Sequence, residues 1–225
     1  EFYERAGLVE TLAGPRGSIS IIGSVSPPGG DFSEPVTTHT RRFVRGIWVL
    51  DRDLSYARHF PAISWTESYS EYVDDVQGWW AKEVDPDWLS MRYEVMDLLQ
   101  KEQKLLQVVK LVGPDVLPQS QRLILEVCDL FKNAFLQQSA FDRTDTYSSA
   151  KKQVLMLRAI LALYHEADKL VQKGASVSDI RAMEVFTDIV RMKFRYGEDD
   201  LERLAGLPEQ IKKECAALEK SWTSR

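Results

Sequence analysis

Residues 95–109 read VMDLLQKEQKLLQVV, and their pattern decides the predicted fold of most of the chain. Apolar side chains recur there at intervals of three and four residues, which places them along one face of an α-helix. Similar spacing predicts an all-helical region from about residue 69 onward. The predicted helices span 69–82, 87–111, 120–137, 148–173, 177–194 and 199–222, and they are separated by Asp85-Pro86, Gly113-Pro114, residues 142–146, Gly174 and Gly197.

The first 68 residues have a different pattern and hold most of the prolines and glycines. Residues 17–26 contain the β-branched residues Ile19, Ile21, Ile22 and Val25 in quick succession, which favours a strand buried on both faces of a parallel sheet. Residues 43–50 predict a second buried strand, 51–59 a connecting helix, and 1–12 the end of an earlier helix. Together these elements resemble the last βα units of a doubly wound sheet, whose ligands bind at the carboxyl ends of the strands.

Composition excludes several classes of function. The chain has 29 Lys and Arg against 34 Asp and Glu, and a net charge of −5 offers no basic surface to nucleic acid. No run reaches the roughly 18 apolar residues of a membrane span, so we expect no direct membrane insertion. Cys128 and Cys215 fall in helical apolar patterns and are expected to be buried. Three scattered histidines without partner cysteines predict no metal site.

The motifs of common catalytic sites are absent from the sequence. No Gly-x-x-x-x-Gly-Lys-[Ser/Thr] occurs, nor any Gly-Lys pair, so the chain holds no phosphate-binding loop of that type. Gly-x-Ser-x-Gly and His-Glu-x-x-His are also missing. We therefore expect no catalytic residue within these 225 residues.

Two segments combine turn residues with a polar tip. Residues 26–35, SPPGGDFSEP, directly follow the first predicted strand. Their prolines fix φ and their glycines permit positive φ, which predicts a rigid bend into an acidic loop. This loop is either a turn with a helix cap at Ser33 or Thr37, or a contact surface. Residues 111–118, LVGPDVLP, predict a tight helical hairpin tip, again either a plain connection or a contact surface.

Two further segments contain aromatic residues at predicted junctions or loops. Phe60 is followed by Pro61 within RHFPAI, residues 58–63, where the two predicted regions meet. Residues 135–147, FLQQSAFDRTDTY, lead from a helix end into a polar loop. Both segments are compatible with plain packing. Both are also compatible with stacking on a flat neutral base, with Gln138 available for hydrogen bonds.

These segments occur in an order that resembles one known family. The strings EFYERAG (1–7), GSISIIG (17–23), SPPGGDFSEPVT (26–37), RHFPAI (58–63) and FLQQSAFD (135–142) are similar to those of the catalytic A subunit of archaeal and bacterial V/A-type ATPases. The resemblance covers almost the entire chain and points to the A type rather than to the non-catalytic B type. On this resemblance the chain is expected to be the C-terminal part of that catalytic protein.

The resemblance implies a mainly α fold. Residues 69–225 would form a C-terminal helical bundle domain, preceded at 1–68 by the last βα units of a P-loop-type α/β nucleotide-binding domain. It also implies that the full-length protein binds ATP or ADP with Mg²⁺ and acts at an interface with the B subunit, which supplies an arginine finger. Central stalk subunits would turn within an A3B3 hexamer and couple the reaction to proton or sodium transport. The complex would lie peripherally on the cytoplasmic side of the cell membrane.

The resemblance also assigns roles to residues of this chain. On the adenine side, Phe60 and Pro61 are similar to the aromatic and proline that flank the base in the related F-type β subunit, and Phe141 and Tyr147 fall where two further aromatics would be. The remaining wall would come from Gln138, Ala140 and Thr144. The contact with the central stalk would come from the loop Gly29, Gly30, Asp31, Phe32, Ser33 and Glu34, and from Pro114 and Asp115 at the hairpin tip.

Two departures from the family limit this assignment. Residues 118–121, PQSQ, replace an acidic run of the F-type tip, so a contact by shape is favoured over one by charge. Residues 64–67, SWTE, stand where the family usually has Asn-Trp-Leu.

The alternative function is a stand-alone, non-enzymatic interaction module derived from the same family.

Overall fold

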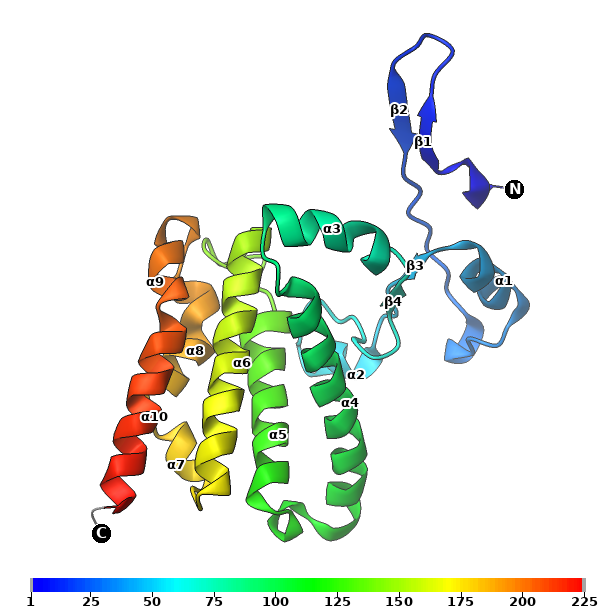
Figure 1. Ribbon diagram of the computed structural model, residues 1–225. Helices are drawn as coiled ribbons and strands as arrows, with labels where there is room; N and C mark the ends of the chain where they lie inside the picture. Colours follow the sequence, from blue (N-terminus) through cyan, green and yellow to red (C-terminus); the bar gives the residue numbers. More distant parts are fainter. Residues whose placement is uncertain (1, 224–225) are drawn as a thin grey trace.

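A computed structural model describes residues 2–223, and Glu1 lies outside this range. Figure 1 shows a bundle of upright helices with α3 lying across its top, and an N-terminal hairpin that projects away from it. The strands are β1 (Gly7–Glu10), β2 (Arg16–Ile19), β3 (Gly46–Ile47) and β4 (Tyr69–Ser70). The helices are α1 (Pro35–Phe43), α2 (Arg52–Tyr56), α3 (Val73–Glu83), α4 (Trp88–Val112), α5 (Gln119–Phe131), α6 (Ala150–Gln172), α7 (Val177–Arg181), α8 (Glu184–Arg195), α9 (Leu201–Ala205) and α10 (Leu207–Thr223).

The predicted mainly α fold is confirmed, and its core lies around α6. This helix packs against α4, α5, α8, α9 and α10. Its inward stripe includes Ala159, Leu163 and Ala167, all of them fully buried. Cys128 and Cys215 are buried free thiols as expected, and burial raises the pKa of the Cys128 thiol to about 12. At neutral pH this thiol is therefore protonated and packs as a small apolar side chain.

The ends of α6 follow from local sequence chemistry. The Ser149 side chain accepts a hydrogen bond from the N–H of Lys152 and caps the first turn. At the other end Gly174 adopts φ +104°, and the N–H of Ala175 binds the Leu170 carbonyl at 3.0 Å. A residue with a side chain is strained at this φ, which explains why the predicted break at Gly174 is confirmed.

Three helices of the bundle that were predicted as continuous are interrupted in the structure. The helix predicted at 120–137 is α5 followed by one π-helical turn, Lys132–Leu136. The helix predicted at 177–194 is divided into α7 and α8, because Met183 is extended and buried. The Glu214 carboxylate of α10 accepts from the N–H of Val185 at 3.0 Å and so fixes the start of α8. The helix predicted at 199–222 is likewise divided at Gly206 into α9 and α10.

The predictions for residues 1–26 are wrong in their detail. Residues 7–10 form β1 instead of a helix end, and β1 pairs antiparallel with β2 rather than lying in a parallel sheet. The strand predicted at 17–26 extends only over Arg16–Ile19. Within residues 2–223 no second layer covers the hairpin, so Leu8 and Ile19 stay 67% and 62% exposed. An apolar pattern predicts that a strand can be buried, but burial also requires helices or strands from elsewhere in the fold to cover it.

Between the hairpin and the bundle lie α1, α2 and a second small sheet. The strand predicted at 43–50 is reduced to β3, which pairs antiparallel with β4 in the segment predicted as the start of a helix at 69. Trp48 and Leu50 are 72% and 77% exposed, so this strand is not buried as predicted. The connecting helix predicted at 51–59 is confirmed as α2, which Asp51 caps through the N–H of Leu54.

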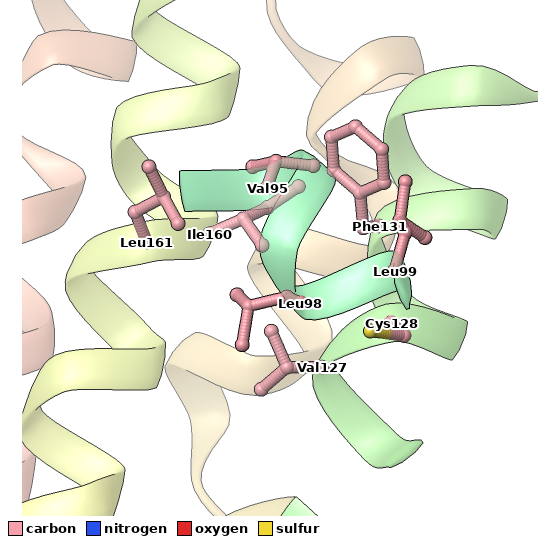
Figure 2. A pocket seen from close by; sticks show the side chains of 8 residues that line it. All are labelled: Val95, Leu98, Leu99, Val127, Cys128, Phe131, Ile160 and Leu161. Carbon is pink, nitrogen blue, oxygen red and sulfur yellow. The ribbon is translucent and has the colours of Figure 1, made fainter. Parts of the chain in front are cut away.

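The bundle core contains one small cavity. Figure 2 shows it between α4, α5 and α6, with Leu98, Leu99 and Phe131 among its apolar lining. Its volume of about 10 Å³ is at the lower limit for a single water molecule. The core is therefore close-packed and offers no ligand site here.

Truncation at this cavity should destabilise the fold strongly. Leu99 is 1% exposed, and Leu99→Ala should lower the free energy of unfolding by about 2–5 kcal/mol, because it enlarges the cavity and removes buried methyl groups. Urea denaturation measures the change. The matched control is Leu111→Ala, at a leucine that is 85% exposed, with an expected change within about 0.5 kcal/mol. Equal losses for the two variants would contradict this core.

Candidate functional site

The two predicted adenine-side segments meet in the structure through one backbone hydrogen bond. The N–H of Gln138, just beyond the π-helical turn, donates to the Phe60 carbonyl at 2.8 Å. Residues 78 positions apart in sequence are thereby held side by side. Phe135 and Leu136 at the start of the second segment pack against the bundle core, whereas both Phe60 and Gln138 are exposed.

The loop after Gln138 is fixed by its own carboxylates. Asp145 is 4% exposed, and its carboxylate accepts from the N–H of Ser139 at 2.6 Å. The Gln138 side-chain amide donates to the Asp145 carbonyl at 2.8 Å. Asp142 closes the turn by accepting from the N–H groups of Thr144 and Asp145. The loop is thus ordered by short-range hydrogen bonds rather than by apolar packing.

The aromatic rings of this region face outward. Phe60 is 51% exposed, Phe141 101% and Tyr147 67%, and Pro61 and Ala140 are also exposed while Thr144 is half-buried. No ring contact within residues 2–223 joins the three aromatic side chains. The arrangement is an open surface with three aromatic side chains rather than a closed pocket. Such a surface offers exposed aromatic faces on which a flat partner can stack.

A buried polar cluster connects the Phe60 segment with the bundle. His59, next to Phe60, donates from Nε2 to the Lys132 carbonyl at 3.0 Å and lies edge-on to the Trp65 ring. The Lys132 ammonium forms an ion pair at 2.5 Å with Glu102 of α4 and lies 5.3 Å from the centre of the Trp65 ring. Because Glu102 is only 4% exposed, this pair is protected from solvent and fixes Phe60 relative to α4 and α5.

The acidic loop is a helix cap and an exposed turn at once. Gly29 and Gly30 adopt φ of +64° and +77° and carry the chain around the bend. The Asp31 carboxylate accepts from the N–H and the hydroxyl of Ser33, and hydrogen bonding to that hydroxyl lowers the pKa of Asp31. Glu34 caps α1 instead of Ser33 or Thr37, so that expectation is corrected. An acidic side chain one residue before Pro35 can reach the free N–H groups of the first turn.

The hairpin tip is built as predicted from Gly113 and Pro114. Gly113 has φ +82°, and Pro114–Val116 form a short 3-10 helix before α5 begins. Leu117 is buried, and its carbonyl accepts from Nε of Arg122 at 3.0 Å. Leu111 and Val116 are 85% and 68% exposed, which gives the tip an apolar character. The side chain of Asp115 lies outside the part that the structure describes.

Metal clusters and membrane spans are both absent from the described residues. Residues 2–223 contain no group of three or more His, Cys, Asp or Glu placed to hold a metal ion. In the same range no helix is long and apolar enough to cross a bilayer.

Two family models match the chain. The "ATP synthase alpha/beta family, nucleotide-binding domain" matches residues 1–70. The "C-terminal domain of V and A type ATP synthase" matches residues 77–181. Both matches have the order that the sequence predicted.

Individual relatives identify the type of subunit within this family. The "V-type ATP synthase alpha chain" of Halothermothrix orenii is 50% identical over 94% of this chain, and the A subunit of the A-type ATP synthase of Thermococcus onnurineus is 48% identical over 99%. The chain belongs to the family of V/A-type ATP synthase A subunits. It spans 36% and 38% of the length of these two relatives.

One solved structure supports the fold. The "unique ATP synthase subunit NeqB" from Nanoarcheaum equitans superposes with a TM-score of 0.59 over 72% of this chain and 37% of its own. At 23% identity this likeness shows the fold alone.

Several buried charged residues near the site were missed from the sequence. Lys152 and Lys193 are 1% and 3% exposed, and Asp145 and Glu102 are also buried. Helical spacing carried a signal for the lysines, since Lys152 precedes buried Met156 by four positions and Lys193 follows buried Ile189 by four. A charged residue on a predicted apolar stripe indicates a buried polar contact.

The cap at Glu34 predicts a pH effect on α1. Hydrogen bonds from the Thr37 hydroxyl and N–H hold the pKa of Glu34 below its ordinary value of 4.5. The stabilisation is therefore present above pH 4.5 and is lost as the pH falls through the lower, folded-state pKa. Carboxyl ¹³C NMR of Glu34 measures this pKa. Thr37→Val removes the hydroxyl donor and keeps the backbone N–H, so the pKa of Glu34 should move back toward the ordinary value. An identical titration of the two proteins would refute the part of the Thr37 hydroxyl in this cap.

Proposed function

We propose that this chain forms the adenine-facing wall of the ATP site and the stalk-facing surfaces of the catalytic A subunit of a V/A-type rotary ATPase. The observation that carries the proposal is the hydrogen bond between Phe60 and Gln138, in a chain whose relatives are A subunits over almost its entire length. This bond brings together the two segments that the family resemblance assigns to the base. We also propose a division near residue 68 into nucleotide-binding and helical parts, in line with the two family matches.

The base site uses stacking rather than charge. Phe60 and Pro61 provide one face, and Phe141 and Tyr147 provide aromatic rings from the loop. Gln138, Ala140 and Thr144 complete the wall. The Gln138 side-chain amide already donates to the Asp145 carbonyl, so its remaining N–H and its oxygen are the groups available to a base. Each stacked aromatic face contributes about 1–3 kcal/mol.

Phosphoryl transfer does not belong to these residues. The sequence lacks the Gly-Lys pair that cradles phosphates, and residues 2–223 lack a cluster of metal ligands, so they do not fit Mg²⁺ bound to a triphosphate. We therefore assign no catalytic residue to the chain. ATP hydrolysis or synthesis, with Mg²⁺, is a property that we propose for the full-length protein.

The partners we propose are the B subunit, in an A3B3 hexamer, and the subunits of the central stalk. The loop from Gly29 to Glu34 and the tip at Pro114 and Asp115 are the proposed stalk-facing elements, because both are turns with exposed residues such as Asp31 and Pro114. The tip would act by shape, since Leu111 and Val116 are its exposed side chains. The assembly would lie peripherally on the cytoplasmic side of the cell membrane and drive proton or sodium transport.

Nucleotide affinity tests the base site directly. We expect the chain to bind adenosine with a dissociation constant of about 1 mM, which corresponds to about −4 kcal/mol and to two or three stacking contacts. ATP should bind no more tightly than adenosine, because the chain offers no phosphate site. Titration by ¹H–¹⁵N NMR measures both affinities. The variant Phe60→Ala should weaken binding, with Phe43→Ala as its matched control, and micromolar ATP affinity would refute the assignment.

Rotation of the assembled ATPase tests the stalk-facing loop. Asp31→Asn keeps an oxygen that can accept from Ser33 but removes the charge, whereas changes at Glu34 would also damage the cap of α1. We expect slower rotation and looser coupling of ATP hydrolysis to ion transport in Asp31→Asn, because a charged contact with the stalk is lost. Single-molecule rotation measures this effect. Asp53→Asn, an exposed acid of α2, is the control, and unchanged rotation in Asp31→Asn would argue against stalk contact by this charge.

A further inference from the structure

Lys152 of α6 and Lys193 of α8 are buried beneath the loop that follows Gln138. The structure shows no ion pair for either ammonium group within residues 2–223. The Lys193 ammonium donates to the carbonyls of Asn133 and Gln137, both at 2.7 Å. The Lys152 ammonium donates to the carbonyls of Thr144 and Lys193, both at 3.2 Å.

The acceptors explain why lysines occupy these apolar positions. Asn133 lies within the π-helical turn, Gln137 follows it directly, and Lys193 lies in the last turn of α8. Carbonyl groups at such helix ends have no partner within their own helix. A long cationic side chain satisfies such carbonyls and interacts favourably with the helix dipole. Burial lowers the pKa of Lys193, which shows the cost of placing this charge in the bundle.

The two lysines connect both sides of the proposed base site. Lys193 holds Gln137, whose neighbour Gln138 donates to the Phe60 carbonyl. Lys152 holds Thr144, three residues before Tyr147, and also binds the backbone of Lys193. A continuous set of hydrogen bonds therefore runs from Phe60 through the bundle to the far side of the loop.

We propose that Lys152 and Lys193 are positioning residues that set the separation between the Phe60 side and the Tyr147 side of the base site. This inference rests on the proposed function, because it needs a base to bind there. The lysines do not touch the base. They fix the backbone on both sides of it, so that two aromatic faces can be used by the same ligand.

Methionine substitutions distinguish a positioning role of the two lysines from an effect on protein stability alone. Lys152→Met and Lys193→Met keep a long apolar stem. The first leaves the carbonyls of Thr144 and Lys193 without this donor, and the second those of Asn133 and Gln137. Each variant should bind adenosine at least about fivefold more weakly, equivalent to losing one stacking face. Lys151→Met, at the exposed neighbouring lysine, is the matched control and should bind as the unchanged chain does. Circular dichroism verifies that each chain is folded at the temperature of the NMR titration.

Hydrogen exchange of the unchanged chain provides a test that does not depend on the variants folding. The amide of Gln138 donates to the Phe60 carbonyl and lies next to Gln137, which Lys193 holds, so it should exchange nearly as slowly as the amides of α6. Fast exchange of this amide would overturn the inference. Folded variants that bind adenosine as tightly as the unchanged chain would overturn it too, since a merely structural role lowers the melting temperature alone. If the unchanged chain shows no adenosine-dependent shift, the proposed function itself fails, and the inference fails with it.

Discussion

Burial of the inward face of α6 is the constraint on which the rest of the structure depends. Helices of this length are marginal on their own in water, and most of their stability comes from packing an apolar face. The other bundle helices meet on α6, whose stripe continues from Met156 to Leu170. The small residues Ala159 and Ala167 within it allow neighbouring helices to approach closely. One member of the stripe, Lys152, is charged, and its ammonium is directed to backbone carbonyls rather than to solvent.

Two of the proposed functional surfaces, the hairpin tip and the loop with Phe141, lie at opposite ends of the same run of helix. The hairpin tip precedes α5, and the loop with Phe141 follows the π-helical turn that continues α5. One continuous run of helix therefore connects the tip that we propose faces the stalk with the loop that we propose faces the base. The ion pair between Lys132 and Glu102 fixes this run to α4, the other arm of the hairpin, close to Phe60. Such a paired arm is suited to moving as a rigid body.

Sequence patterns predicted the features of this fold that are local. The helical periods of α4 and α6 and the break at Gly174 were correctly predicted, because spacing, caps and positive φ are local properties. The division between α7 and α8 was missed, because the Glu214 carboxylate that fixes the start of α8 comes from α10. The strand at 17–26 was predicted as buried, but burial of a strand depends on neighbouring layers that its own residues do not encode. For the candidate site, Phe60 and Gln138 were named from family motifs, whereas their hydrogen bond and the lysines beneath it are long-range contacts.

By itself, the sequence determined the class of fold, the order of the helices and the family, since these follow from periodicity, turn chemistry and distinctive strings such as SPPGGDFSEPVT at 26–37. Only the tertiary structure decided which polar groups are buried and which segments meet. Lys193 occupies a position that periodicity marks as apolar, yet it is retained there because the carbonyls of Asn133 and Gln137 need a donor. That need arises only when α8 packs against the end of α5. A local pattern cannot show a hydrogen bond between residues that come together through folding of the whole bundle.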